Sequence, residues 1–258
     1  MTIIRTVSEL RQAIKTAKEK GLSIGLVPTM GALHNGHKSL VERACRDNDI
    51  VVVSVFVNPT QFNNPDDLAQ YPRTEQDDVK MLEETGVDIA FIPTVNEVYG
   101  DTPDTRVFDL GSVADVMEGA MRPGHFNGVA QIVSRLFRWT EPTRAYFGEK
   151  DFQQIVVIRR MAEIEGFNTL EIVACPIVRE ADGLALSSRN VRLTPQLRKL
   201  APEIHHTLRQ SIEQKKQGAD IDTVINNVIN KLNNLPEVRV EYFSIVNPDT
   251  MHEIKDWD

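Results

Sequence analysis

Two histidines, His34 and His37, stand between an apolar run that ends at Val27 and a helical pattern that follows at once. This arrangement is a strand-to-helix turn, where α/β proteins bind phosphate. Gly31 and Gly36 let the backbone turn sharply and approach a ligand closely. The next helix offers unpaired N–H groups and the positive end of its dipole. The imidazoles add side-chain donors at the same place, so the turn is predicted to bind an anion.

The spacing argues against two common phosphate motifs. A dinucleotide fingerprint needs GxGxxG, and a P-loop needs GxxxxGK followed by Ser or Thr. Here Gly31 is followed five residues later by Gly36 and then by His37, so imidazoles take the place of the P-loop lysine. Two alternatives stay open. The two histidines could ligate a metal, although no further ligand stands at helical spacing, and His34 could be a structural turn residue.

Amide side chains follow the next strand-like run. Asn58 and Gln61 come directly after the run Ile50 to Val57, and the carboxyl ends of strands form the ligand crevice of an open parallel sheet. An amide offers donors and an acceptor without a charge, which suits a substrate with a carboxylate and hydroxyls. The alternative is that Asn58 and Pro59 only start a turn.

Lys150 lies in the segment Gly148 to Asp151, which ends another strand-like run and starts a helix that carries Gln154. A cation at a helix N-terminus is opposed by the dipole, so an anion is its natural companion. We therefore expect Lys150 to meet phosphate. A surface ion pair with Glu149 or Asp151 is the alternative, and such pairs contribute little to stability.

Two hydroxyls and a guanidinium follow each other at Ser187, Ser188 and Arg189. Together they form a set of donors for phosphate oxygens, and arginine can bind such oxygens in bidentate fashion. A serine-rich turn is the alternative. Arg122 and His125 also stand beside a helix start, where the dipole does not favour them, which indicates a function for that block as well.

Asp77 and Asp78 lie in the first turn of a predicted helix. Acidic residues there usually complement the helix dipole. They are also candidate Mg²⁺ ligands next to ATP phosphates.

These blocks, in order from Pro28 to Asn190, resemble the pantoate–β-alanine ligase family of the HxGH nucleotidyltransferases. The resemblance implies that ATP and pantoate form pantoyl adenylate with loss of pyrophosphate, and that β-alanine then displaces AMP to give pantothenate. It also implies Mg²⁺ on the triphosphate and a homodimer. A different HxGH nucleotidyltransferase and a nucleotide-binding regulatory module are the alternatives.

The resemblance assigns roles to individual positions. The implied catalytic residues are His34, His37, Lys150, Ser187, Ser188 and Arg189. The implied ATP-binding residues are Met30, Gly31, Ala32, Leu33, His34, Asn35, Gly36, His37, Gly148, Glu149, Lys150, Asp151, Val178, Leu186, Ser187, Ser188 and Arg189. The implied pantoate and β-alanine contacts are Pro28, Thr29, Met30, Asn58, Gln61 and Gln154.

The elements that must position these residues alternate between apolar runs and helical patterns. The predicted strands are Ile24 to Val27, Ile50 to Val57, Asp88 to Ile92, Ala145 to Phe147 and Leu170 to Ala174. The predicted helices are Gly36 to Arg46, Glu75 to Thr85, Phe126 to Trp139 and Phe152 to Glu165. This order is typical of a parallel sheet covered on both faces, so residues 1–176 are predicted to form a Rossmann-like, doubly wound α/β domain.

The pattern changes after Pro176. A hairpin around Asp182 and Gly183 precedes two mostly polar helical patterns, Pro195 to Gln217 and Ile221 to Leu235, and an alternating run from Val238 to Val246. We expect residues 177–258 to form a smaller α+β C-terminal domain that covers the site.

Composition bounds the partners. The 258 residues carry a formal net charge of −8, which gives no electrostatic footprint for nucleic acid. The two cysteines, Cys45 and Cys175, suit a reducing compartment. No stretch approaches 18 apolar residues. We therefore expect a cytoplasmic protein that binds small molecules and neither nucleic acid nor membrane.

Overall fold

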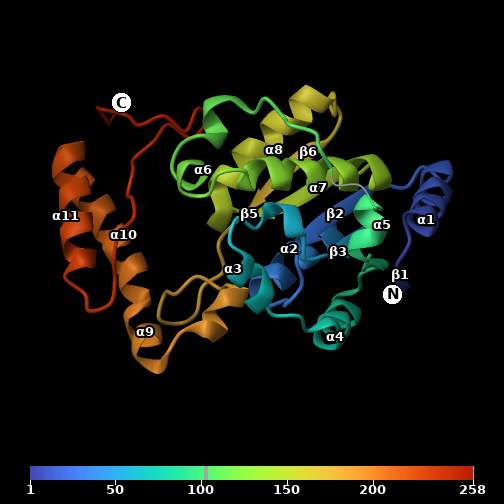
Figure 1. Ribbon diagram of the computed structural model, residues 1–258, viewed down its shortest axis with the longest axis horizontal. Helices are drawn as coiled ribbons and strands as arrows, with labels where there is room; N and C mark the ends of the chain where they lie inside the picture. Colours follow the sequence, from blue (N-terminus) through green and yellow to red (C-terminus); the bar gives the residue numbers. More distant parts are fainter. Residues whose placement is uncertain (102–103, 258) are drawn as a thin grey trace.

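A six-stranded parallel sheet forms the centre of the protein, seen in a computed structural model that describes residues 1–101 and 104–257 (Figure 1). The strands are β1 (Thr2–Ile4), β2 (Ile24–Thr29), β3 (Ile50–Val55), β4 (Ile89–Phe91), β5 (Arg144–Gly148) and β6 (Glu171–Cys175). Their order across the sheet is β1-β4-β3-β2-β5-β6. The chain reverses its direction across the sheet at β2, and such a switch point opens a crevice outside the strand ends.

Helices and short 3₁₀ turns connect the strands. The α-helices are α1 (Val7–Glu19), α2 (Asn35–Asp47), α3 (Pro65–Gln70), α4 (Glu75–Thr85), α5 (Val95–Tyr99), α6 (Glu118–Met121), α7 (His125–Thr140), α8 (Phe152–Glu165), α9 (Pro195–Leu200), α10 (Pro202–Lys216) and α11 (Ile221–Asn233). The 3₁₀ turns are η1 (Pro59–Gln61), η2 (Gly111–Ala114), η3 (Glu149–Asp151) and η4 (Ser188–Arg192). The predicted α/β class and its parallel sheet are confirmed, and the five predicted runs all form strands.

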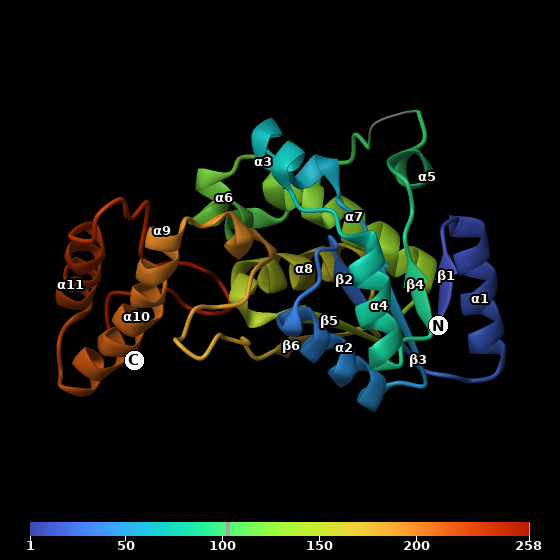
Figure 2. The ribbon, with the colours of Figure 1, turned by 90° about the horizontal axis from the view of Figure 1, so that it is seen from below.

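The sheet is covered on both faces, as the doubly wound prediction requires (Figure 2). On one face, α2 and α4 pack on the sheet through buried side chains such as Val41 and Leu82. On the other face, α1, α7 and α8 contribute Leu10, Phe137 and Ile158. The inner strands β2, β3 and β4 are therefore buried on both sides, which explains why they are mainly apolar runs in the sequence.

One buried carboxylate shapes the turn between β2 and α2. Asp78 is only 2% exposed. One of its oxygens accepts the backbone N–H of Leu33 at 2.7 Å and the other accepts that of Ala32 at 3.0 Å. The Thr74 hydroxyl adds a third bond of 3.2 Å. Gly31 has a φ of 80°, and a Cβ there would lie 3.0 Å from the Asp78 carboxylate, so the turn needs glycine at this position.

A second glycine lets η1 approach α7. A Cβ on Gly128 would lie 2.3 Å from the carbonyl oxygen of Thr60, which is shorter than any real carbon contact. The same close approach lets the Asn58 side chain donate to the Gly128 carbonyl at 3.1 Å. The loop after β3 is thereby fixed against α7.

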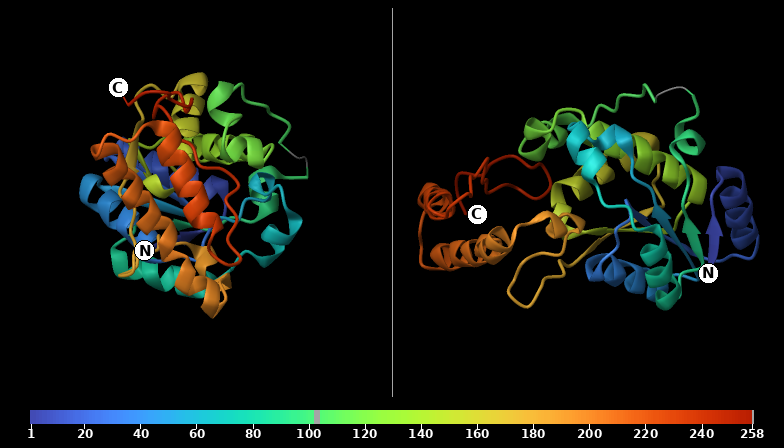
Figure 3. Two further views of the ribbon diagram at one scale, coloured as in Figure 1. Left: turned by 90° about the vertical axis from the view of Figure 1, so that its left-hand side faces the viewer. Right: turned by 60° about the horizontal axis from the view of Figure 1, so that its bottom comes forward.

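The chain beyond β6 lies to one side of the sheet. Figures 1 and 3 show α10 and α11 side by side, at the far end of the molecule from α1. The apolar face of α11 is buried through Ile221, Val224 and Val228. The predicted turn near Asp182 is present, with a single antiparallel bridge between Arg179 and Ala185.

The strand predicted from Val238 to Val246 is wrong, because this segment is irregular and holds only an isolated bridge between Val246 and Glu253. Alternation alone does not make a strand when no neighbouring strand supplies hydrogen bonds. The segment instead runs back to the sheet domain, where the Tyr242 hydroxyl donates to Glu118 at 3.1 Å. The expected α+β character of the C-terminal part is therefore corrected to helices with an irregular tail.

Among the described residues, none of the helices combines the length and the apolar character needed to cross a membrane.

Replacing Asp78 by Ala should lower the free energy of unfolding by about 1–3 kcal/mol, because two partly buried backbone N–H groups lose their acceptor. The neighbouring Asp77 is exposed, so Asp77→Ala is the matched control and should change stability by less than about 0.5 kcal/mol. Urea unfolding of the three proteins measures both values. Equal losses in the two variants would contradict this role of Asp78.

Replacing Gly128 by Ala should destabilise the protein by about 1–3 kcal/mol, because the added methyl group forces α7 and η1 apart. Gly148 is the control, since a Cβ there meets nothing within 4 Å. Thermal unfolding of Gly128→Ala and Gly148→Ala checks the difference. An unchanged melting temperature for Gly128→Ala would contradict this prediction, because it would show that α7 and η1 accommodate the methyl group without a loss of stability.

Candidate active site

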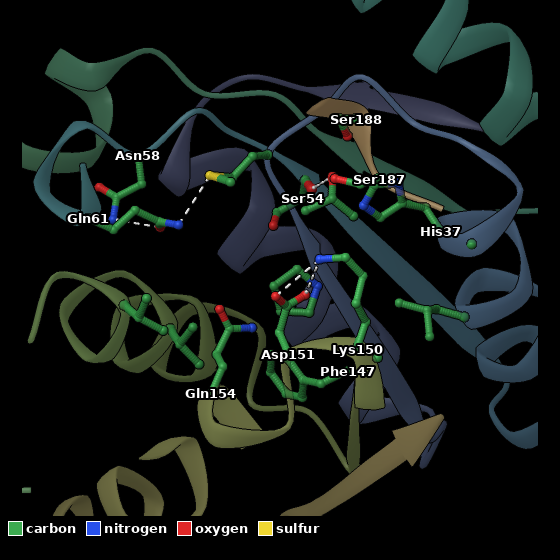
Figure 4. A pocket seen from close by; sticks show the side chains of 18 of the residues that line it. His37, Ser54, Asn58, Gln61, Phe147, Lys150, Asp151, Gln154, Ser187 and Ser188 are labelled. Atoms are coloured by element: carbon green, nitrogen blue, oxygen red, sulfur yellow. Dashed lines mark hydrogen bonds and ion pairs between the residues drawn. The ribbon is translucent and has the colours of Figure 1, made fainter. Parts of the chain in front are cut away.

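A cavity of about 240 Å³ lies outside the carboxyl ends of β2, β3 and β5. In Figure 4, Asn58 and Gln61 lie at one end of it and His37, Ser187 and Ser188 at the other, with Ser54 between them. The predicted site residues that line it are Pro28, Thr29, Met30, His34, Gly36, His37, Asn58, Gln61, Gly148, Lys150, Asp151, Gln154, Val178, Leu186, Ser187, Ser188 and Arg189. The predicted residues outside its lining are Gly31, Ala32, Leu33, Asn35, Glu149, Asp77 and Asp78.

The two histidines cap the helix that they begin. The backbone N–H of Gly36 donates to His34 Nδ1 at 3.1 Å, and the backbone N–H of His34 donates to His37 Nδ1 at 3.3 Å. A ring nitrogen that accepts carries no proton, so the remaining proton of each neutral ring is on Nε2. The rings lie together, with centroids 4.0 Å apart. His34 Nδ1 therefore has a structural role as a helix cap, and His34 Nε2 stays available to a ligand.

Both rings are kept neutral by their surroundings. Burial, followed by the proximity of His34 and then of the Lys150 ammonium, lowers the pKa of His37 to about 3. Burial and then Lys150 also lower the pKa of His34. A neutral ring that accepts at Nδ1 can donate only from Nε2, so the pair offers hydrogen-bond donors without positive charge.

Amides form the other end of the cavity. Asn58 and Gln61 are buried, and Asn58 Nδ2 donates to Gln61 Oε1 at 3.1 Å. The backbone carbonyl oxygen of Gln61 accepts a hydrogen bond from His125 Nδ1 at 2.7 Å. The guanidinium of Arg122 lies 3.5 Å from the other nitrogen of the same imidazole. The block around Arg122 and His125 thus supports the loop that carries Gln61 as well as lining the cavity.

Lys150 and Gln154 reach the cavity from the start of α8 (Figure 4). The Lys150 ammonium pairs with Asp151 at 3.3 Å, and both side chains are largely exposed. Exposed pairs of this kind are weak, so the ammonium is available to an anion. Gln153 points elsewhere, because its amide donates to the carbonyls of Val113 and Val116.

The second block of donors closes onto the first turn. Ser188 donates to the carbonyl oxygen of Ala32 at 2.9 Å. Arg189 forms two bonds to Asp67, of 3.2 and 2.8 Å, and its guanidinium lies 5.2 Å from the ring centre of Tyr71. The hydrogen bond from Arg189 lowers the pKa of the Asp67 carboxyl. Arg189 lines the cavity, but a carboxylate holds it.

The magnesium prediction for Asp77 and Asp78 finds no support. Both oxygens of Asp78 are occupied by backbone N–H groups, and Asp77 is exposed. Neither residue lines the cavity. Within residues 1–101 and 104–257, no group of three or more His, Cys, Asp or Glu side chains is arranged to hold a metal ion. Asp77 and Asp78 therefore do not fit the predicted role of Mg²⁺ ligands at this cavity.

Several residues of the site escaped the sequence analysis. Ser54 is 1% exposed, and its hydroxyl, which lines the cavity, has no hydrogen-bond partner. The one indication in the sequence was that Ser54 is a single polar residue near the end of an apolar run. Val133 of α7 joins Val129 in an apolar wall of the cavity, and its position in the sequence is typical of any core residue of a helix.

The comparisons with known proteins point to one family. The sequence model described as pantoate-beta-alanine ligase matches residues 2–257. A relative named pantothenate synthetase, from Porphyromonas gingivalis, is 55% identical over 257 residues, which is 100% of this chain and 90% of the relative.

Solved structures agree with the sequence comparison. A pantothenate synthetase from Thermus thermophilus superposes with a TM-score of 0.94 at 47% identity, covering 100% of this chain and 91% of that one. A pantoate-beta-alanine ligase from Francisella tularensis, described as complexed with beta-gamma ATP and beta-alanine, gives a TM-score of 0.83 at 37% identity over 96% of this chain and 90% of that one. The chain thus belongs to the pantoate-beta-alanine ligase family.

Proposed function

We propose that this chain joins pantoate to β-alanine with ATP, through a pantoyl adenylate. The observation that carries the proposal is one cavity lined by uncharged imidazoles, an ammonium, three serine hydroxyls and three side-chain amides. Donors at one end suit phosphates, and amides at the other suit a hydroxy acid. Family membership and the relatives' names support the same reaction.

In the first half-reaction, a carboxylate oxygen of pantoate forms a bond to the α-phosphorus of ATP. The bond from that phosphorus to the bridging oxygen breaks, and its electron pair leaves with pyrophosphate. The protein has to hold the two reactants in line and stabilise charge on the phosphates. His34 and His37 donate through Nε2, and Lys150, Ser187 and Ser188 add further donors, so no nucleophilic side chain is needed.

In the second half-reaction, the amine of β-alanine attacks the acyl carbon, loses a proton and displaces AMP. Gln61 and Gln154 would orient the acyl group at the amide end of the cavity. The apolar wall from Val129 and Val133 would cover the methyl groups of pantoate and exclude water from the adenylate.

The proposal includes several properties that rest on the family resemblance. Mg²⁺ would enter on the ATP triphosphate, because the described residues offer no acidic cage for it. Residues 177–258 would act as a lid, since Ser188 and Arg189 reach the cavity from that side. The working form would be a homodimer. A cytoplasmic location suits the two free cysteines.

Pyrophosphate release from ATP and pantoate, measured with and without β-alanine, tests the function. We expect multiple turnovers only when β-alanine is present, with AMP and pantothenate formed together. No release in a protein that still binds ATP would leave the two alternatives: a nucleotidyltransferase with another acceptor, or a regulatory module.

Replacing His37 or Lys150 by Ala should lower pyrophosphate release by about 10²- to 10³-fold, because each removes one preorganised donor. Lys38 lies beside His37 but does not line the cavity, so Lys38→Ala serves as the matched control and should retain activity. Circular dichroism checks that all variants fold. Near-normal turnover in His37→Ala or Lys150→Ala would contradict the assigned role.

The low pKa of His37 gives a stability prediction with a definite sign. Between its ordinary value of 6.5 and about 3, the unfolded chain binds a proton at this position that the folded protein does not. The free energy of unfolding should therefore fall as the pH falls through this window. Urea unfolding at several pH values should show a steeper fall for the natural chain than for His37→Gln. A titration of His37 near 6.5 in ¹⁵N spectra would overturn the prediction.

A further inference from the structure

A chain of hydrogen bonds leads from outside the cavity to Gln61. The Tyr99 hydroxyl donates to Asn58 Oδ1 at 2.6 Å, and the Thr60 hydroxyl donates to the same oxygen at 3.1 Å. Asn58 Nδ2 then donates to Gln61 Oε1 at 3.1 Å. Asn58 is 1% exposed, so these protein groups are its main hydrogen-bond partners.

The chain has one direction, set by a backbone group. Asn58 Nδ2 also lies 3.1 Å from the carbonyl oxygen of Gly128, which can only accept. The amide nitrogen of Asn58 must therefore face Gly128, and its oxygen must face the two hydroxyls. The second N–H of Asn58 then requires the oxygen of the Gln61 side chain, not its nitrogen.

The amide nitrogen of Gln61 is consequently turned toward the cavity. Gln61 Nε2 lies 3.1 Å from the sulfur of Met30, a weak acceptor that also lines the cavity. Figure 4 draws both contacts of the Gln61 amide. A thioether leaves most of the donor capacity of this NH₂ group unused, so a substrate oxygen can take it.

Tyr99 is the last residue of α5 and does not line the cavity. Its ring lies 5.1 Å from the Arg135 guanidinium and 6.3 Å from the ring of Phe56. Arg135 in turn pairs with Asp104 at 2.9 Å. Burial raises the pKa of Tyr99, which keeps its hydroxyl protonated and able to donate.

We propose that Tyr99 is a positioning residue, which acts through Asn58 to hold the Gln61 amide with its NH₂ group toward the acid substrate. This end of the cavity then recognises an oxygen acceptor, the carboxylate or a hydroxyl oxygen of a hydroxy acid. The assignment of that acid as pantoate rests on the proposed function, whereas the orientation of Gln61 does not.

Steady-state kinetics of Tyr99→Phe, Thr60→Val and the double variant test the proposal. Each single variant leaves one donor on Asn58 Oδ1, and the KM for pantoate should rise by about 2- to 10-fold. The double variant leaves that oxygen buried without a donor, and the rise should reach about 10- to 100-fold. Because Gln61 lies at the end away from His37 (Figure 4), the KM for ATP should stay within about twofold.

Two variants control for the loss of packing. Tyr242→Phe removes a hydroxyl that bonds to Glu118 in the C-terminal tail's contact with α6, and should leave all constants unchanged. Thr60→Ser keeps the hydroxyl and should behave as the natural chain. A purely structural role for Tyr99 would instead lower the thermal midpoint and raise both KM values together, and that result would overturn the proposal.

An NMR measurement without substrate separates this proposal from the proposed function. The side-chain amide resonances of Gln61, identified by their loss in Gln61→Ala, should shift in Tyr99→Phe and stay in place in Tyr242→Phe. Such a shift in a protein that releases no pyrophosphate would reject the reaction and keep the positioning role. Unmoved resonances together with an unchanged KM for pantoate in the double variant would reject the positioning role itself.

Discussion

The site depends on one buried carboxylate that holds the turn between β2 and α2. Asp78 accepts the backbone N–H groups of Ala32 and Leu33, which are partly buried and would otherwise lose this partner. A buried donor without an acceptor costs about 1–3 kcal/mol, so the turn and α4 hold each other in place. The carbonyl of Ala32 then faces Ser188, which ties the second block of donors to the same turn.

This turn also fixes the tautomer of the two histidines, His34 and His37. In each ring, Nδ1 accepts a backbone N–H at the start of α2. The ring proton is therefore on Nε2. Their neutrality limits the positive charge at the cavity. Lys150 is weakly paired, whereas Arg189 is held by Asp67 and Arg122 by Glu118, so charge would be supplied mainly by one ammonium. The other donors act through orientation, which is what a phosphoryl transfer needs most.

The fold explains why the phosphate end and the acid end share one cavity. The chain crosses the sheet in opposite directions from β2, so the loops after β2, β3 and β5 meet outside the same strand ends. The amides of Asn58 and Gln61 come from the β3 loop, and Lys150 and Gln154 come from the start of α8. Ser54, with its unpartnered hydroxyl, lies between the two ends (Figure 4).

The sequence by itself predicted the alternation of strands and helices, because apolar periodicity depends on near neighbours in the chain. It also predicted several residues of the lining, since His34, Gln61, Lys150 and Ser187 all follow strand ends or start helices. The sequence alone did not predict contacts between residues that are far apart in the chain. Asp77 and Asp78 are neighbours of equal charge, and only packing shows that Asp78 is buried.

Tertiary structure alone decided the remaining contacts. The run from Val238 to Val246 alternates as a strand does, yet no neighbouring strand lies beside it in the described chain. Tyr99 reaches Asn58 across 41 residues. Periodicity reports which face of an element is apolar, but hydrogen bonds between distant segments depend on where the whole chain brings them, and no local pattern carries that information.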